Sequence, residues 1–546
     1  MEANLAELEE AIAAAIPERE CLVWRDRRRT RAALRERTRR LAQAFLARGL
    51  SRGRPGREGR PGWESGQEHV ALCLYNAPEY LEGMIACFKA GLVPVNVNYR
   101  YTADELVSLL RDADVRGLVY HGAFASRIAE VRVALPRLQI LLQVRDDSGE
   151  PLLAGAEWYE EALAAASPER PDVVWSPDDL YVLYTGGTTG RPKGVLWRQA
   201  DIFMAALGGR RPDGRELASL DEVVARARKG GLRYMPVAPL MHAAHWVAFD
   251  ALHGGHCVVL PDETRRLDAR SVLETVERER VNVLLIVGDA FARPLLEEID
   301  RHGYDLGSLR VVGSGGAVLD PSLKERLLRA LPEGAKVIDT VGSSETGTQA
   351  SQTSTRGRTG GGARFRPNPG ACVLSADRRR RLEPGEQEVG WFAQSGRVPL
   401  GYLGDREKTE ATFPVIDGVR YAIPGDRARF LADGTIELLG RDAATINTGG
   451  EKVFAEEVEQ ALKRHPAVAD AIVCGRPSER WGQEVAAVVQ LRRGAEASAE
   501  ELTRECRRHL AGYKVPRAIV FRPELARSPS GKPDYRWARD QVAGAS

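Results

Sequence analysis

The feature that most limits the fold is a regular alternation of apolar and amphipathic segments between residues 269 and 341. Short apolar runs of strand length alternate there with longer runs whose apolar residues recur at helical spacing. The predicted helices are Ala269–Arg280, Ala290–Arg301 and Pro321–Ala330, and the predicted strands are Val281–Val287, Leu309–Gly313 and Ala335–Val341. Strands that alternate with helices form a parallel sheet covered by helices, so the predicted fold class is α/β. Ligands of such sheets bind beyond the carboxyl ends of the strands.

The same rhythm begins near Val70 and changes further along the chain. We expect a large N-terminal domain, residues 1–440, of parallel and mixed sheets flanked by helices, with a small β-rich subdomain at about 370–440. Residues 441–546 are long enough for a separate α+β C-terminal domain. Ser351–Pro369 has no periodicity and is expected to be a loop, and the chain after Leu510 is expected to be a tail.

Composition excludes several classes of protein. The 78 Lys+Arg residues nearly balance the 76 Asp+Glu residues, and a net charge of +2 favours neither a nucleic acid nor a membrane surface as partner. Seven cysteines without a C-x-x-C pair argue against a disulfide framework or a zinc ribbon. The acidic start of the chain is unlike a secretory signal, and Val281–Gly288 is too short for an integral membrane segment. We therefore predict a cytoplasmic protein, and a homo-oligomer stays open.

The stretch from Tyr184 to Gly194, YTGGTTGRPKG, carries the strongest chemical signal. It holds three threonines, four glycines and Lys193, one of only ten lysines among the 78 basic residues. Glycine lets the backbone approach an anion closely, and the hydroxyls and the ammonium donate hydrogen bonds to it. The stretch is thus predicted to bind phosphate. It is not the P-loop of NTPases, because Gly190 lies three residues before Lys193.

This stretch resembles the signature loop of the adenylate-forming superfamily, which includes acyl-CoA synthetases, adenylation domains of peptide synthetases and firefly luciferase. The other motifs of that superfamily follow in order from about Val70 to Trp537. The resemblance implies a small, mobile C-terminal domain that closes over a site on the large domain. It also implies ATP, Mg²⁺ and coenzyme A as cofactors, and a small-molecule carboxylic acid as the substrate.

The resemblance assigns the nucleotide to residues in both domains. Val341-Gly-Ser-Ser-Glu345 resembles the motif Y-G-x-T-E, so Glu345 is expected to hold Mg²⁺. Asp426 and Arg441 are expected at the ribose hydroxyls. The full ATP- and AMP-binding set is Thr185, Gly186, Gly187, Thr188, Thr189, Gly190, Lys193, Gly315, Gly316, Ala317, Ser343, Ser344, Asp426 and Arg441.

Three positions depart from the superfamily pattern. Val341 replaces the usual aromatic residue at the adenine, and Pro424 replaces a threonine. Ala443 stands where many relatives carry Asp or Lys, with Asp442 one residue early, so the hinge residue is open between these two.

The resemblance also assigns the acyl group, CoA and the catalytic residues. Lys532, in Ser528-Pro-Ser-Gly-Lys532, is expected to enter the site for adenylation, and the catalytic residues are Lys532, Glu345 and His242. The acyl pocket is expected at His242, Ala243, Gly288, Asp289, Gly315 and Val341. CoA is expected at Gly449, Gly450, Lys514 and Arg517, although for Lys514 and Arg517 a solvated basic face is an equal reading.

These motifs predict an AMP-forming acyl-CoA ligase, and the strings LYTGGTTG, GSSETG and INTGGEKVF most resemble fatty-acid and steroid or terpenoid side-chain ligases. Small residues around the pocket favour a bulky, apolar acid. Asp289 is the one acidic residue near the start of the expected pocket helix Ala290–Arg301, and it either faces the pocket or pairs with Arg293. Two alternatives stay open: a partial ligase that mainly forms the thioester from an acyl-adenylate, and a non-catalytic nucleotide-binding scaffold.

Overall fold

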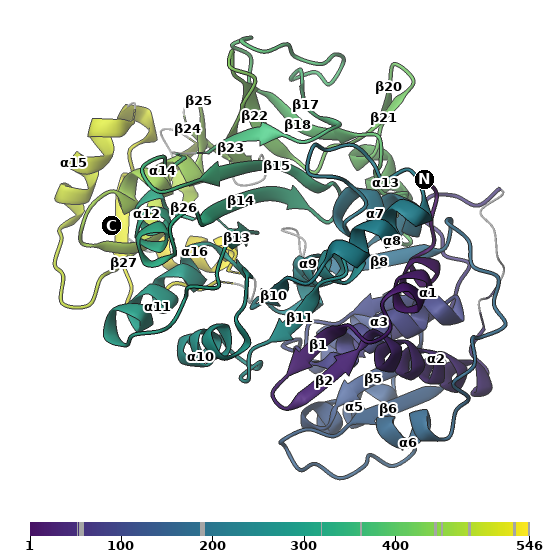
Figure 1. Cartoon of the computed structure of the whole chain (residues 1–546). Coiled ribbons are helices and arrows are strands. Elements are labelled where there is room, and N and C mark those ends of the chain that lie inside the picture. The colour runs from purple at the N-terminus through teal and green to yellow at the C-terminus, as the bar shows by residue number, and fades with distance from the viewer. Residues whose placement is uncertain are drawn as a thin grey trace. The chain divides into compact units, whose positions relative to one another are not determined.

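The computed structural model describes residues 1–51, 53, 59–185, 192–317, 319–360, 363–441, 445–448, 451–478, 482–510, 512–527 and 531–543. The chain forms two compact units. Unit 1 comprises Met1–Gly360, Asn368–Gly370 and Gln394–Ala422, and unit 2 comprises Gly361–Pro367, Ala371–Ala393 and Ile423–Ser546. Figure 1 labels many of the helices and strands of both units. A domain boundary between residues 440 and 441, and the mobility of the C-terminal domain, stay predictions.

Unit 1 contains a five-stranded sheet with strand order β4-β3-β5-β6-β7, in which all pairs are parallel. Its strands are β3 (His69–Cys73), β4 (Val93–Asn96), β5 (Val115–His121), β6 (Ile140–Val144) and β7 (Glu157–Trp158). The helices between and after them are α3 (Pro78–Ala90), α4 (Ala103–Asp112), α5 (Ala125–Arg132) and α6 (Tyr159–Ala164). Every residue of α3 is buried, so this helix lies inside the unit.

A second sheet of unit 1 has the strand order β2-β1-β11-β10-β12-β13-β14-β15. Its strands are β1 (Glu20–Trp24), β2 (Arg27–Thr30), β10 (Arg233–Pro236), β11 (Cys257–Leu260), β12 (Val283–Ile286), β13 (Val311–Gly315), β14 (Lys336–Ser343) and β15 (Gly347–Ser354). The pairs from β1 to β14 are parallel, and only β1·β2 and β14·β15 are antiparallel. The α/β prediction from the alternating segments is confirmed.

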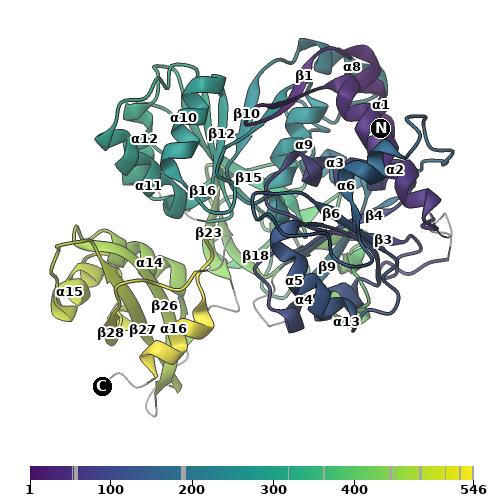
Figure 2. The ribbon, with the colours of Figure 1, turned by 90° about the horizontal axis from the view of Figure 1, so that it is seen from below.

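Helices cover this sheet as its parallel connections require. They are α9 (His245–His253), α10 (Ala269–Glu279), α11 (Gly288–Arg301) and α12 (Pro321–Ala330). Figure 2 shows α10, α11 and α12 gathered together beside β10 and β12. The remaining helices of unit 1 are α1 (Leu5–Ala15), α2 (Arg31–Ala47), α7 (Gln199–Ala206), α8 (Leu220–Lys229) and α13 (Arg406–Thr412).

Unit 1 also contains a three-stranded antiparallel sheet, and two of its strands flank the candidate phosphate loop. Its order is β19-β9-β8, with β8 (Leu180–Thr185), β9 (Lys193–Arg198) and β19 (Gly401–Tyr402). The apolar residues of β8 and β9 are buried in the main hydrophobic core. The short hairpin strands β20 (Val415–Ile416) and β21 (Val419–Ala422) follow α13.

Unit 2 has an antiparallel β part and an α+β part. The β part comprises β16 (Arg364–Pro367), β17 (Ala371–Leu374), the residues of β18 (Gly390–Ser395) up to Ala393, β22 (Asp426–Phe430) and β23 (Ile436–Arg441). The sheet of the α+β part comprises β24 (Thr445–Thr448), β25 (Glu451–Phe454), β26 (Val468–Ser478), β27 (Gly482–Leu491) and β28 (Ala518–Phe521). Helices α14 (Ala455–Lys463) and α15 (Ala499–His509) pack with one core of this sheet, and α16 (Tyr535–Val542) packs with the other.

Two expectations about secondary structure are wrong. Ser351–Pro369 is not a loop, because it contains the end of β15 and all of β16. β15 consists largely of polar residues, which hid its periodicity, but its backbone pairs with β14 and Lys324 donates to Gln352 Oε1 at 2.7 Å. Figure 1 shows β14 and β15 side by side. The expected C-terminal tail contains α16, whose first turn is capped by Asp534.

Candidate active site

The candidate phosphate loop connects β8 to β9. The two strands pair as a hairpin in which Thr185 stands opposite Lys193 and Tyr184 opposite Gly194. Gly186, Gly187, Thr188, Thr189 and Gly190 lie outside the described residues. At Gly194 a side chain would collide with the Tyr184 ring, because an added Cβ would lie 2.7 Å from it. The hairpin therefore places Thr185 and Lys193 opposite each other at the end next to the loop.

Lys193 forms an ion pair with Asp405, a residue that the sequence analysis did not single out. Asp405 also caps α13, since its carboxylate accepts a hydrogen bond from the backbone N–H of Lys408 at 2.9 Å. Burial alone would raise the pKa of the Asp405 carboxyl, but the hydrogen bonds from Lys193 and Lys408 hold that pKa below its ordinary value. Asp405 is thus a carboxylate that stays charged beside the lysine.

Glu345 lies in the turn between β14 and β15 and contacts the same region. The hydroxyl of Tyr402 donates to Glu345 Oε1 at 2.8 Å. Around the Tyr402 ring, Lys193 Nζ lies 6.0 Å and Lys408 Nζ 4.9 Å from the ring centroid. A carboxylate and two ammonium groups, from segments far apart in the sequence, therefore gather around one tyrosine.

The turn that carries Glu345 is held by its own hydroxyl groups. The backbone N–H of Ser343 donates to Thr346 Oγ1 at 3.0 Å, and the backbone N–H of Glu345 donates to Ser343 Oγ at 3.2 Å. The indole of Trp197 in β9 donates to the carbonyl of Ser344 at 2.8 Å. The hydroxyl of Ser343 is thus engaged in the turn, and the turn is fixed to the strand that follows the phosphate loop.

His242 lies in an irregular turn, Leu240–Ala244, just before α9. Its backbone is extended (φ −107°, ψ −172°) inside this otherwise helical stretch, and the neighbouring Ala243 is exposed. Buried His245 contacts this turn, because its Nδ1 lies 2.7 Å from the carbonyl oxygens of both Leu240 and His242. Burial lowers the pKa of His245 to about 4, so this imidazole is neutral at pH 7.

The other expected pocket residues lie at the carboxyl ends of β12, β13 and β14. Gly288 begins α11, and its N–H donates to Ser314 Oγ at 3.1 Å. Gly315 ends β13 opposite Thr340 of β14, where a Cβ would lie 2.8 Å from Thr340 Oγ1. Gly316 and Ala317 follow directly, and Val341 faces Ala350 in the β14·β15 ladder.

Asp289 has a partner that the sequence did not suggest. Its Oδ1 accepts a hydrogen bond from the backbone N–H of Asp320, the residue that caps α12, at 2.7 Å. Asp289 therefore takes part in joining the start of α11 to the start of α12.

Unit 2 carries the remaining expected nucleotide residues. Asp426 begins β22 and stands opposite Arg441, the last residue of β23, in the antiparallel ladder. Lys532 is exposed and follows Gly531, whose φ is +74°. Arg527 donates to the carbonyl of Gly531 at 2.9 Å and pairs with Asp470 at 2.7 Å.

The expected CoA residues fall partly outside the described chain. Gly449 and Gly450, between β24 and β25, lie outside the described residues. Asp442 and Ala443, before β24, also lie outside them. Lys514 pairs with Glu457 at 2.7 Å, and Arg517 is exposed. Lys514 therefore has a carboxylate partner within unit 2.

The described ranges contain no group of three or more His, Cys, Asp and Glu side chains that could hold a metal ion. In the same ranges no helix has the length and apolarity needed to cross a membrane. All seven cysteines are free and buried.

The family model for AMP-binding enzymes matches residues 9–396, and the model for the AMP-binding enzyme C-terminal domain matches residues 457–532. The chain belongs to the AMP-binding enzyme family. It is an AMP-forming acyl-CoA ligase, and ligases of this family use ATP and CoA as substrates.

Two curated relatives span nearly the whole chain. It is 53% identical over 535 residues to "Medium-chain acyl-CoA ligase Mig" of Mycobacterium avium, covering 97% of each chain. It is 41% identical over 553 residues to "3-oxocholest-4-en-26-oate--CoA ligase" of Rhodococcus rhodochrous, covering 99% of this chain and 96% of the relative. These relatives do not favour the partial ligase or the scaffold.

Solved structures support the fold. The anthranilate CoA ligase AuaEII in complex with anthranoyl-AMP matches with a TM-score of 0.82 at 23% identity, covering 97% of this chain and 96% of the other. The amide bond synthetase McbA from Marinactinospora thermotolerans matches with a TM-score of 0.79 at 24% identity, covering 99% and 100%.

Proposed function

We propose that this ligase converts a bulky, largely apolar carboxylic acid, of the medium-chain or steroid side-chain type, to its CoA thioester. The names of the full-length relatives support this substrate class. Gly316 supports it too, since a side chain added there would meet only Val287 Cγ1, at 4.0 Å, beyond the carboxyl end of β13. Asp289 hydrogen-bonds to the α12 cap and is less suited to an amino acid's ammonium group, which would need a carboxylate partner.

The observation that carries the proposed phosphate site is the gathering of Lys193 and Glu345 around Tyr402. We assign Thr185, the rest of the loop and Lys193 to the phosphates of ATP, and Ser344 to the same region. Glu345 is one carboxylate rather than a cage, which suits Mg²⁺, because this ion is commonly held by one or two carboxylates together with substrate phosphates. When bound, Mg²⁺ would neutralise phosphate charge beside Glu345.

The reaction then has two steps. A carboxylate oxygen of the acid attacks the α-phosphorus of ATP, and pyrophosphate leaves. The two anions repel each other by about 4 kcal/mol per charge pair at 4 Å and an effective dielectric constant of 20. We assign Lys532 to offset this repulsion and Lys193 to hold the departing pyrophosphate. The thiol of CoA next attacks the acyl carbon and loses its proton, and AMP leaves.

The remaining assignments follow the same scheme. Asp426 and Arg441, paired in one ladder, bind the ribose hydroxyls. His242 and Ala243 line the acyl pocket beside the carboxylate of the acid, and Gly449, Gly450 and Arg517 contact CoA. Lys514 is the weaker CoA candidate, because it already pairs with Glu457. Closure of residues 441–546 brings Lys532 to the site in the first step only, and the cytoplasm is the compartment we propose.

The direct test is a pair of assays on the whole chain. Acid-dependent exchange of labelled pyrophosphate into ATP reports adenylation, and product mass after adding CoA reports the thioester. We expect both with decanoate or a steroid side-chain acid. Thioester formed only from a supplied acyl-adenylate would instead identify a partial ligase. The absence of both activities would contradict the proposal.

A further inference from the structure

Residues 401–405, here called the β19 segment, lie directly beside the strand that begins at Lys193. Gly401 pairs with Leu196 and Tyr402 with Val195 in the antiparallel β19·β9 ladder. The backbone N–H of Leu403 then donates to the carbonyl of Gly194 at 2.8 Å. The backbone of the β19 segment is therefore fixed up to the residue next to Lys193.

Two side chains of the β19 segment reach the two side chains assigned above to phosphate and Mg²⁺. Asp405 forms an ion pair with Lys193, and the Asp405 side chain is 29% exposed and the Lys193 side chain 30%. Tyr402 donates its hydroxyl hydrogen to Glu345 Oε1 at 2.8 Å. Because these contacts come from residues three apart in one segment, the same short backbone sets the positions of the ammonium and the carboxylate.

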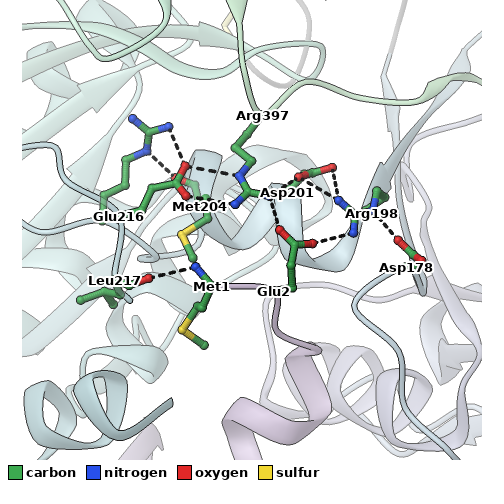
Figure 3. Close-up of polar contacts among 10 residues, drawn as sticks. Met1, Glu2, Asp178, Arg198, Asp201, Met204, Glu216, Leu217 and Arg397 are labelled. Carbon is green, nitrogen blue, oxygen red and sulfur yellow. Dashed lines mark hydrogen bonds and ion pairs between the residues drawn. The ribbon is translucent and has the colours of Figure 1, made fainter. Parts of the chain in front are cut away.

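The chain that enters the β19 segment is also anchored, by the cluster of arginines and carboxylates in Figure 3. Arg397 donates to Asp201 at 2.9 Å and to Glu216 at 3.0 Å, and it pairs with Glu2 at 2.5 Å. Arg198, the last residue of β9, pairs with the same Glu2 at 2.6 Å and with Asp201 at 3.3 Å. Two carboxylates thus join the end of β9 to the chain that leads into β19.

We propose that Asp405 and Tyr402 are positioning residues for adenylation, Asp405 acting through Lys193 and Tyr402 through Glu345. This inference rests on the proposed roles of Lys193 and Glu345. Asp405 holds the side chain of Lys193, which is long and flexible, at the start of β9 before ATP arrives, so less side-chain entropy is lost when the phosphates bind. Tyr402 fixes one oxygen of Glu345 and leaves the other for the cation.

Two conservative variants separate these roles from a purely structural one. Asp405→Asn keeps an oxygen that can cap α13, because asparagine is as good a cap as aspartate, but it removes the charge that holds Lys193. Tyr402→Phe keeps the ring and removes the hydroxyl. Glu410→Gln is the matched control, since Glu410 is an exposed carboxylate of α13 that forms an ion pair with Arg406.

The experiment measures ATP binding by calorimetry without acid or CoA, at several Mg²⁺ concentrations, and the KM for ATP in pyrophosphate exchange. We expect Asp405→Asn to weaken ATP binding and raise its KM about tenfold, the scale of one charge-assisted contact. We expect Tyr402→Phe to raise the Mg²⁺ concentration needed for half-maximal ATP binding by a few fold, and Glu410→Gln to change neither quantity. In a Lys193→Ala background, Asp405→Asn should cause no further loss.

The outcomes separate failure of this inference from failure of the proposed function. If Lys193→Ala itself leaves ATP binding unchanged, the proposed phosphate role is wrong. If Lys193→Ala weakens binding while Asp405→Asn leaves it unchanged, tightens it, or adds its full effect in the double variant, only the positioning role of Asp405 is overturned. An unchanged Mg²⁺ requirement in Tyr402→Phe, alongside a raised one in Glu345→Gln, overturns the positioning role of Tyr402.

Discussion

Asn96 and Tyr184 exchange two hydrogen bonds at the end of β8 that leads into the phosphate loop. Asn96 Nδ2 donates to the carbonyl of Tyr184 at 2.8 Å, and the backbone N–H of Tyr184 donates to Asn96 Oδ1 at 2.6 Å. The same Nδ2 donates to the carbonyl of Met241 at 2.7 Å, and Asn96 is 8% exposed. One buried amide therefore connects the end of β4, the hairpin, and the turn that carries His242.

Asn96→Ala should destabilise the protein and weaken ATP binding together. It leaves three buried backbone groups without this partner, and we expect the free energy of unfolding to fall by about 3 kcal/mol. Denaturant unfolding measures this change, and Asn98→Ala is the control, because Asn98 is only partly buried and accepts a bond from the N–H of Arg100. A loss no larger than that of the control would show that Asn96 does not hold the hairpin.

Much of the architecture could be predicted, because it depends on apolar periodicity. Helices α10, α11 and α12 begin and end within about two residues of their predicted bounds, and β14 was recognised as a strand. β15 was missed because its sequence, GTQASQTS, has no apolar alternation. Its pairing partner is β14, and its polar side chains are accommodated inside, with Gln349 1% exposed and Ser354 0% exposed.

The candidate site was predictable only where residues lie within one motif. Lys193 and Glu345 stand in recognisable strings, but their partners Asp405 and Tyr402 do not. Asp405 lies 212 residues from Lys193, and Tyr402 lies 57 residues from Glu345. Contacts at such separation are created by strand pairing between β9 and β19, which a single sequence does not reveal.

Lys532→Ala should abolish adenylation while largely sparing thioester formation from a supplied acyl-adenylate. The positive charge is needed where two anions meet, and that happens only in the first step. Pyrophosphate exchange measures the first step, and CoA thioester from synthetic acyl-adenylate measures the second. Lys229→Ala, at an exposed lysine ending α8, is the control. Equal losses in both steps would contradict this division of labour.

Glu345→Gln should leave the protein folded, raise its Mg²⁺ requirement and slow adenylation. The amide oxygen of glutamine can still accept the bond from Tyr402, but a hard cation prefers a charged oxygen. The rate of pyrophosphate exchange across a Mg²⁺ titration measures the effect, with exposed Glu333→Gln as the control. An unchanged Mg²⁺ midpoint would mean that the cation binds elsewhere.

Stability should fall in acid partly through His245. Its pKa is lowered by burial to about 4, so between pH 4 and the ordinary histidine value the unfolded chain binds a proton that the folded chain does not. From pH 7 to pH 4 this histidine should therefore cost up to about 3 kcal/mol of stability. Unfolding of His245→Gln over that range should show a correspondingly shallower decline, whereas exposed His302→Gln should follow the parent chain. Parallel curves for His245→Gln and the parent chain would contradict this contribution.

The most direct test of the central claim is kcat/KM for CoA thioester formation across acids from acetate through decanoate to polycyclic carboxylates, with α-amino acids included. If the pocket is apolar and wide, each buried methylene contributes about 0.8 kcal/mol, or roughly fourfold, so kcat/KM should climb steeply with size until the pocket is full. We predict a maximum at a medium-chain or polycyclic acid. Acetate or an α-amino acid outperforming every larger apolar acid would contradict the account.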